Sequence, residues 1–448
     1  MSEKIQWAVN HMPKSDDAHL GIMSLDNVKK ARAFHKSFPQ YTVTPLARLD
    51  GQAARLGLGN LCVKDESYRF GLNAFKVLGG SFAMANYIAD ETGKDVAECT
   101  FDYLTSDQLA KDFGQATFFT ATDGNHGRGV AWAANKLGQK AVVHMPKGST
   151  KPRFDNIAAE GAKVTIEEVN YDECVRMAAA EADACERGVI VQDTAWEGYE
   201  KIPSWIMEGY GTMASEAAEQ LREMAINRPT HVFVQAGVGS LAGAVVGYFT
   251  NLFPDNPPTF VVAECAPAAC LYKGAVAGDG DPRIVDGDMP SIMAGLCCGE
   301  PNILGWGYPS QPRDRVRLLP RLGDRPRHAH PRRPREGRPA RHLRRVRRRY
   351  DGPRRDPHAR PGVRRAQGGH RPGQDELRAV LLHRRRHRPR AVPPHRLGGR
   401  VPHLLGTTAA RAAQAIGNEG HRTERFTTWL SSSTTISSRR PPRTTART

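Results

Sequence analysis

The composition of the chain changes abruptly near Trp306, and this change limits which parts of it can fold. From Met1 to Tyr308 there are 27 Lys and Arg against 38 Asp and Glu, a net charge of −11. From Pro309 to Thr448 there are 37 Arg, no Lys and 9 acidic residues, a net charge of +28. The overall net charge of +17 therefore describes neither part, and each needs its own interpretation.

In the first 308 residues, short apolar runs alternate with helical patterns, which is typical of βαβ units and mostly parallel sheets. The expected strands cover 61–64, 117–120, 141–144, 163–167, 189–192, 231–235 and 259–263. The expected helices cover 127–137, 152–160, 171–187, 204–224 and 240–253. We therefore expect an α/β protein with two three-layer αβα domains. The large domain would comprise 1–90 and 212–308, and the small domain 91–211.

The C-terminal part, 309–448, shows no such alternation, because charge and Pro stand where a strand or helix needs apolar residues. We expect it to be disordered or misfolded. A basic segment can indicate a nucleic-acid-binding protein, which is an alternative from another class. Between Pro309 and Arg425, however, Tyr350 is the only aromatic residue on which a base could stack, so we expect no nucleic-acid partner.

The eight cysteines are scattered without a CxxC pair, which favours reduced core thiols over a metal site or disulfide framework. No apolar run reaches the length of a membrane span, and no secretory signal opens the chain. We therefore expect a cytoplasmic protein with no metal and no membrane partner.

Lys76 stands in an apolar stretch, Asn73-Ala74-Phe75-Lys76-Val77-Leu78, that two glycines follow. A buried lysine is easily deprotonated, and a neutral amine can form a Schiff base. Taken alone, the segment also fits a lysine that reaches the solvent.

Two turns add candidate binding residues. The turn Asp123-Gly124-Asn125-His126-Gly127 follows an expected strand and opens a helix, at the sheet edge where such folds bind ligands, although a plain turn with a capping Asp fits as well. The loop Gly237-Val238-Gly239-Ser240 joins another strand to a helix, and its N–H groups could hold a phosphate. Each signal is weak by itself.

Together and in this order, the three segments resemble the fold-type II pyridoxal-phosphate enzymes, the tryptophan synthase β-subunit-like family. The resemblance covers about Lys30 to Trp306 and implies pyridoxal 5'-phosphate as cofactor. It implies that Lys76 carries the cofactor and that Asn125 meets its 3'-hydroxyl. The phosphate would lie on Gly237, Val238, Gly239 and Ser240.

Within this family, the chain is most similar to the diaminopropionate ammonia-lyases. Relatives such as the threonine dehydratases usually have Ser or Thr where this chain has Asp123. The segments Val63–Ser67, Arg69–Lys76, Gln192–Tyr199, Ile292–Leu296 and Cys298–Pro301 also resemble these lyases. The resemblance implies an α,β-elimination of 2,3-diaminopropionate to pyruvate and two ammonia, in a subunit that is commonly part of a homodimer.

Two acids suit this substrate, because a carboxylate can pair with the second ammonium and transfer a proton. We expect Asp123 and Asp193 to be catalytic with Lys76. The alternatives are a helix cap at Asp123 and a structural role for Asp193, while His126 is expected to be structural. A serine or threonine dehydratase is the alternative enzyme.

The C-terminal part has the composition of a GC-rich gene translated in the wrong frame. Codons can be chosen for this part so that a shift of the reading frame by one base gives a readable alternative. The same shift changes Arg344–Gly352 to GESGAGTMG, Leu381–Pro389 to FSTDGDTDP and His395–Arg400 to IVWEG. These three segments resemble the family in order. We therefore infer a frameshift after about Trp306 and expect an unstable or inactive product.

Overall fold

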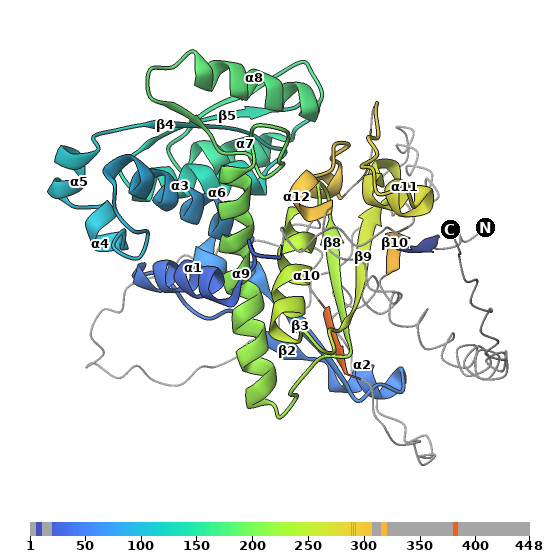
Figure 1. Cartoon of the computed structure of the whole chain (residues 1–448). Coiled ribbons are helices and arrows are strands. Elements are labelled where there is room, and N and C mark those ends of the chain that lie inside the picture. The colour runs from blue at the N-terminus through green and yellow to red at the C-terminus, as the bar shows by residue number, and fades with distance from the viewer. Residues whose placement is uncertain are drawn as a thin grey trace, which may run out of the picture.

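Strands alternate with helices along most of the chain and form two separate sheets (Figure 1). The computed structural model describes residues 6–10, 20–287, 289, 291, 293–306, 315–319 and 380–383. Two sheets and an α/β architecture were both expected from the alternating pattern. The predicted domain limits at 90/91 and 211/212 stay a prediction.

The smaller sheet has four strands in the order β6-β5-β4-β7, and every neighbouring pair is parallel. Its strands are β4 (Thr117–Ala121), β5 (Lys140–Met145), β6 (Lys163–Ile166) and β7 (Gly188–Ile190). Its helices are α6 (Asn125–Lys136), α7 (Lys151–Ala158) and α8 (Tyr171–Asp183). Helix α8 covers one face of the sheet, and α3 (Val77–Thr92) and α6 lie on the other side (Figure 1). These strands and helices agree with the predicted ones to within a few residues.

The larger sheet has seven strands in the order β1-β10-β9-β8-β11-β3-β2. They are β1 (Trp7–Val9), β2 (Leu46–Arg48), β3 (Asn60–Lys64), β8 (His231–Ala236), β9 (Thr259–Cys265), β10 (Arg315–Leu319) and β11 (Val380–His383). Strands β8, β9 and β10 are parallel, and β3 and β8 both run antiparallel to β11, so these four point the same way. Their carboxyl ends therefore meet at one edge of the sheet.

Strands β10 and β11 come from the Arg-rich part of the chain, where the sequence pattern led us to expect none. The physical reason is local. Runs such as Val380-Leu381-Leu382 have strand-forming character, and the neighbouring strands offer unpaired backbone groups to them. The remainder of 309–448, with most of the segments used to infer the frameshift, lies outside the described residues.

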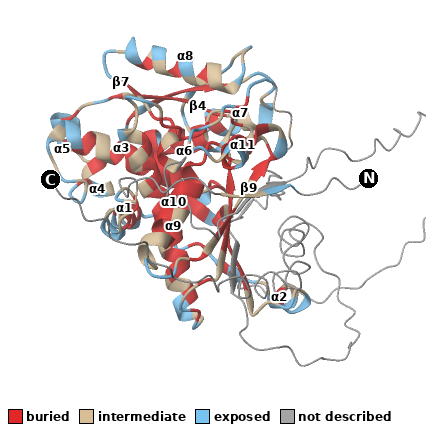
Figure 2. Cartoon of the chain, turned by 45° about the vertical axis from the view of Figure 1, so that its right-hand side comes forward, coloured by how far each residue is buried: buried red, intermediate tan, exposed pale blue. Residues whose placement is uncertain are grey.

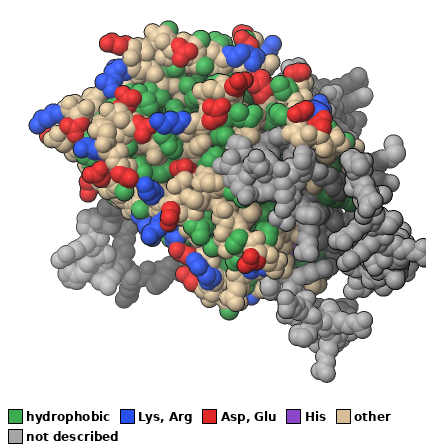
Figure 3. Space-filling model, viewed as in Figure 1, with side chains coloured by type: hydrophobic (Ala, Val, Ile, Leu, Met, Phe, Trp, Pro, Cys, Tyr) green, Lys and Arg blue, Asp and Glu red, His purple; other side chains and the backbone are tan. Residues whose placement is uncertain are grey.

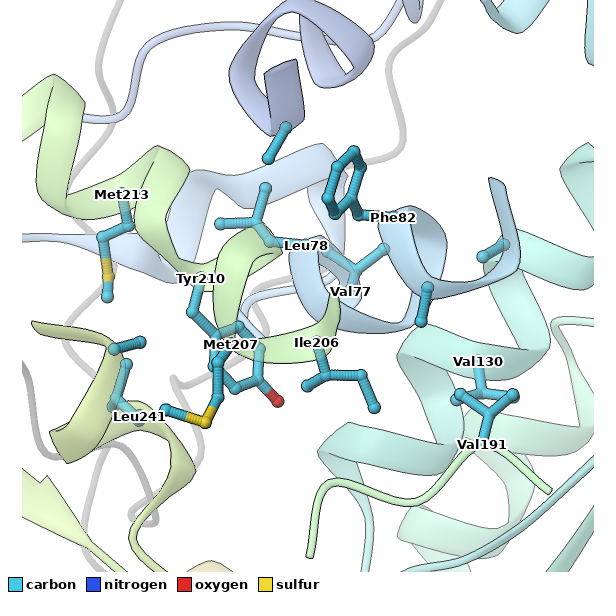
Figure 4. Close-up of a cluster of buried hydrophobic side chains, with 14 of the residues drawn as sticks. Val77, Leu78, Phe82, Val130, Val191, Ile206, Met207, Tyr210, Met213 and Leu241 are labelled. Carbon is cyan, nitrogen blue, oxygen red and sulfur yellow. The ribbon is translucent and has the colours of Figure 1, made fainter. Parts of the chain in front are cut away.

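Helices with many small residues pack around the long helix α9 (Lys201–Glu223). Helix α9 contacts α1 (Leu25–Ser37), α3 and α10 (Ser240–Leu252). A Cβ atom at Gly209 would lie 2.4 Å from the Leu78 carbonyl oxygen, so only glycine permits this approach of α9 to α3. Figure 4 shows the apolar side chains of α9, including Ile206 and Met207, beside those of α3. The start of α3, next to Lys76, is therefore buried and packed closely against α9.

Five further elements complete the described fold, and short 3-10 turns lie between some of them. These five are α2 (Asp50–Arg55), α4 (Phe101–Leu104), α5 (Asp107–Asp112), α11 (Cys270–Ala277) and α12 (Ile303–Trp306). Buried residues concentrate in the strands and in the helix faces that cover them (Figure 2). Acidic and basic side chains intersperse on the surface that Figure 3 shows. Among the helices that the structure describes, none has the length and apolar character that a bilayer span requires.

Candidate active site

A cavity lies where the carboxyl ends of β3, β4 and β8 converge, and its wall includes every site residue selected from the sequence. These residues are Lys76, Asp123, Asn125, Asp193, Gly237, Val238, Gly239 and Ser240. They come from four segments that are far apart in the sequence, so the fold brings the four together.

Lys76 immediately precedes helix α3 and points at the Asp193 carboxylate. Its Nζ lies 2.5 Å from Asp193 Oδ2, and the two side chains are 23 % and 3 % exposed. Gly129 on α6 makes this position possible, since a Cβ there would lie 2.8 Å from the backbone of Val77. The turn that presents Lys76 is therefore packed directly against helix α6.

The pair Lys76–Asp193 is ionised in this arrangement. Burial opposes the charged amine, but the adjacent Asp193 carboxylate outweighs burial and raises the pKa of Lys76. Burial likewise opposes the charged Asp193, yet Lys76 lowers the pKa of its carboxyl to about 2. The expectation that burial makes Lys76 easy to deprotonate is therefore wrong. The sequence does not reveal that Asp193 lies beside the amine and raises its pKa. Lys76 must leave Asp193, or pass on a proton, before it can act as a nucleophile.

The turn between β4 and α6 presents Asp123 and Asn125 to the cavity. Thr122 stabilises the turn by accepting the Gly124 N–H at 2.9 Å. Asn125 is the first residue of α6 and is exposed, which leaves its amide available to a ligand. Asp123 lies 3.9 Å from Arg153 Nη1, so an arginine on α7 faces this acid at the cavity.

His126 has the structural surroundings that we expected. It is buried, and its Nε2 lies 2.8 Å from the Val191 carbonyl oxygen, which joins α6 to the segment after β7. Burial lowers its pKa, so the neutral ring donates to that carbonyl. The contact holds the segment that continues to Asp193.

The glycine loop connects β8 to α10 and suits a bound anion. Gly239 has φ +105°, a conformation that favours glycine, and α10 begins with the next residue. A Cβ at Gly237 would lie 3.3–3.4 Å from Gly295, Leu296 and Cys298, so a larger residue would press on the opposite wall. The N-terminal N–H groups of the 13-residue helix α10 face this side, where they and the helix dipole favour a phosphate. The donors and the space fit the phosphate of the implied cofactor.

The Ser240 hydroxyl is hydrogen-bonded within the protein. It donates to the backbone oxygen of Asp193, so Ser240 offers an anion its backbone N–H.

Sequence reasoning missed several residues of the wall. Tyr210 lies on α9 and is 1 % exposed. In the sequence it occupies an apolar position of a helix, which predicts a core residue and gives no sign of a place in the cavity wall. Lys64, Glu66 and Cys298 belong to segments that resemble the family, so a signal for them was present but unassigned. All eight cysteines are free and six are buried, and the described residues hold no cluster of His, Cys, Asp or Glu suited to a metal.

Comparison with known proteins decides the family. A model of the pyridoxal-phosphate-dependent enzymes matches residues 38–320. The diaminopropionate ammonia-lyase of Salmonella typhimurium is 50 % identical over 308 residues, which are 68 % of this chain and 76 % of that protein. The chain belongs to the diaminopropionate ammonia-lyase family of pyridoxal-phosphate-dependent enzymes. The diaminopropionate ammonia-lyase of Escherichia coli K12 is 48 % identical over 286 residues, 64 % of this chain and 70 % of that protein.

Solved structures agree with this membership. The diaminopropionate ammonia-lyase of Escherichia coli in complex with an aminoacrylate-PLP azomethine reaction intermediate superposes with a TM-score of 0.63 at 43 % identity, over 71 % of this chain and 77 % of that one. The same enzyme with D-serine gives a TM-score of 0.64 at 42 % identity, over 70 % and 77 %. The L-threonine dehydratase of Salmonella typhimurium is less similar to this chain, with 29 % identity over 53 % of this chain and 38 % of that protein.

Proposed function

We propose that this site catalyses the pyridoxal-phosphate-dependent α,β-elimination of 2,3-diaminopropionate to pyruvate and two ammonia. The observation that carries the proposal is the 2.5 Å pair of Lys76 and Asp193 in one cavity with Asp123, Asn125 and the glycine loop. The family membership supports the same reaction.

The proposed cofactor contacts follow from the chemistry of the wall. Lys76 supplies the amine that holds the cofactor, and the Asn125 amide can meet the ring hydroxyl. The backbone N–H groups of Gly237 to Ser240 face the phosphate. When bound, the cofactor joins an amine through its aldehyde and accepts the electrons of the broken α-carbon bond.

The two acids distinguish the substrate from a hydroxy amino acid. Diaminopropionate carries a second ammonium, which a carboxylate can bind and orient before it leaves as ammonia. Asp123 is partly exposed in the cavity and Asp193 is buried, so Asp123 is the one more open to an incoming cation. Lys76 and Asp123 are the candidates for removing the α-proton, and if they act from opposite faces the site accepts both enantiomers.

Two measurements test the proposal. Borohydride reduction followed by peptide mapping should place the cofactor on Lys76, and a label elsewhere would refute the assignment. Ammonia release should be faster from diaminopropionate than from serine, whereas the reverse would favour the serine or threonine dehydratase alternative.

Both measurements should compare the 448-residue chain with a version whose reading frame is restored after Trp306. We propose that the Arg-rich part results from a frameshift and makes the present chain unstable or inactive. A present chain with full cofactor absorbance and activity would contradict this part of the proposal. Homodimer assembly, a cytoplasmic location and the lack of a nucleic-acid partner stay predictions; sedimentation, fractionation and a DNA mobility shift test them.

A further inference from the structure

Asn302 lies against the glycine loop and is fully buried. It directly precedes α12, a short helix that contacts α10. The Asn302 N–H donates to the Val238 carbonyl oxygen at 2.7 Å. Close by, a Cβ at Gly305 would lie 3.0 Å from the Gly239 carbonyl oxygen, so the loop and this segment are packed backbone to backbone.

The Asn302 side chain connects two parts of the site. Its Nδ2 donates to Ser240 Oγ at 2.6 Å and to the Asp193 carbonyl oxygen at 3.3 Å. Its Oδ1 accepts the Leu304 N–H at 2.9 Å, which fixes the orientation of the amide. The Ser240 hydroxyl also donates to the Asp193 carbonyl oxygen. Two side chains therefore converge on the main chain of Asp193.

This anchoring acts on the residue whose carboxylate holds Lys76. The Asp193 backbone follows β7 and is tied on its other side through His126 to Val191. With its carbonyl oxygen held, the short Asp193 side chain has few ways to point, and one of them places Oδ2 2.5 Å from Lys76 Nζ. The attraction of an ion pair weakens as its charges move apart, and the loss is larger where little water screens them.

We propose that Asn302 is a positioning residue: it ties the glycine loop to the Asp193 backbone and thereby holds the Asp193 carboxylate against Lys76. The inference rests on the proposed function only in naming Lys76 as the reactive amine. Through the buried amide of Asn302, an anion bound at the glycine loop can then influence the protonation of Lys76.

The test measures the protonation of Lys76 directly in the cofactor-free full-length chain. Competitive acetylation at a series of pH values, followed by peptide mapping, gives the pH midpoint at which Lys76 becomes reactive. Asp193 raises the pKa of Lys76, so loss of its alignment should move the midpoint to lower pH. An opposite charge nearby typically shifts a pKa by about one to three units, so partial loss in Asn302→Ala should lower the midpoint by about one unit. Below the midpoint, Lys76 would then be labelled about tenfold faster at a given pH.

Matched variants separate positioning from stability. Asn302→Leu retains most of the side-chain volume without its hydrogen bonds and should shift the midpoint like Asn302→Ala. Asn251→Ala is the control, because Asn251 also donates two side-chain hydrogen bonds to backbone oxygens, at 2.9 Å and 2.8 Å, but at the far end of α10. Its Lys76 midpoint should stay unchanged.

Two results would overturn the inference. One is weaker binding of inorganic phosphate in both Asn302 variants with an unchanged Lys76 midpoint, which would confine Asn302 to the loop. The other is full additivity of Asn302→Ala and Ser240→Ala in the midpoint, because residues that share one anchor should not act independently. Neither result depends on where borohydride places the cofactor, so the two proposals fail separately.

Discussion

Replacement of Glu216 by Gln should destabilise the chain strongly, because Glu216 is the centre of a buried charge network beneath the cavity. Glu216 on α9 is 0 % exposed. Its oxygens lie 2.7 Å from Lys64 Nζ, 2.8 Å and 2.9 Å from the two terminal nitrogens of Arg69, and 2.7 Å from the Tyr41 hydroxyl. The variant leaves Lys64 and Arg69 with Glu66 as the remaining carboxylate of the network.

The expected loss is about 3–5 kcal/mol, the usual cost of removing one partner from a buried ion pair. It should approach the lower end, because burial already lowers the pKa of Lys64, which can become neutral when its partner is gone. A loss of this size is a large part of the roughly 5–15 kcal/mol that stabilises a folded chain.

Urea unfolding at neutral pH, followed by tryptophan fluorescence, measures the loss. Asp95→Asn is the control, since the Lys30–Asp95 pair has side chains that are 48 % and 54 % exposed and should contribute about 0–1 kcal/mol. A loss below about 1 kcal/mol for Glu216→Gln would refute the reasoning about the network.

The pH dependence provides a second measurement of the same network. Burial opposes the charge, but hydrogen bonds from Arg69 and the charge of Lys64 lower the pKa of Glu216 to about 2, from the ordinary 4.5. A lowered folded-state pKa contributes stability that is present above pH 4.5 and is lost as the pH falls toward 2. Over this window, the stability of Glu216→Gln should change less steeply than that of the parent chain.

Three further changes have defined outcomes. Gly129→Ala should force α6 away from Val77, cost about 1–3 kcal/mol in urea unfolding and reduce cofactor incorporation; unchanged incorporation would contradict the packing argument. Asp123→Asn should lower ammonia release from the two diaminopropionate enantiomers unequally, and equal losses would exclude a face-specific role. Burial raises the pKa of Glu264 from 4.5 to about 8, so the stability of the folded chain should fall as the pH rises from 4.5 through 8. Thermal unfolding of Glu264→Gln should show a smaller dependence of stability on pH over this range. An unchanged dependence would refute the assignment.

The sequence predicts the parallel βα units well, including the central helices α9 and α10, but it does not predict helix α3. From β4 to β9, apolar runs alternate with amphipathic helices, and the expected limits agree closely with the structure. Helix α3 was missed because every residue from Val77 to Ala85 is buried, so this part of the helix has no polar face to produce a helical period. Its two glycines look like loop residues, but Gly79 is needed because a Cβ there would lie 2.6 Å from Ile206.

In the site, too, the sequence reveals local motifs but not contacts between distant segments. Lys76, Asp123, Asn125 and the glycine loop follow from short motifs, because the chemistry depends on local residue order. The ionised state of Lys76 and the anchoring by Asn302 depend on contacts across more than 100 positions, for which one sequence offers no pattern.

The order of the larger sheet has a consequence for how the chain can be divided. Strand β1, from the beginning of the chain, pairs with β10, while β11 fills the gap between β8 and β3. A fragment that stops at Trp306 would lack both of these partners and present open edges to other molecules. For this reason, removal of everything after Trp306 would divide the larger sheet into the pairs β9-β8 and β3-β2, and their exposed edges would allow copies of the truncated chain to aggregate.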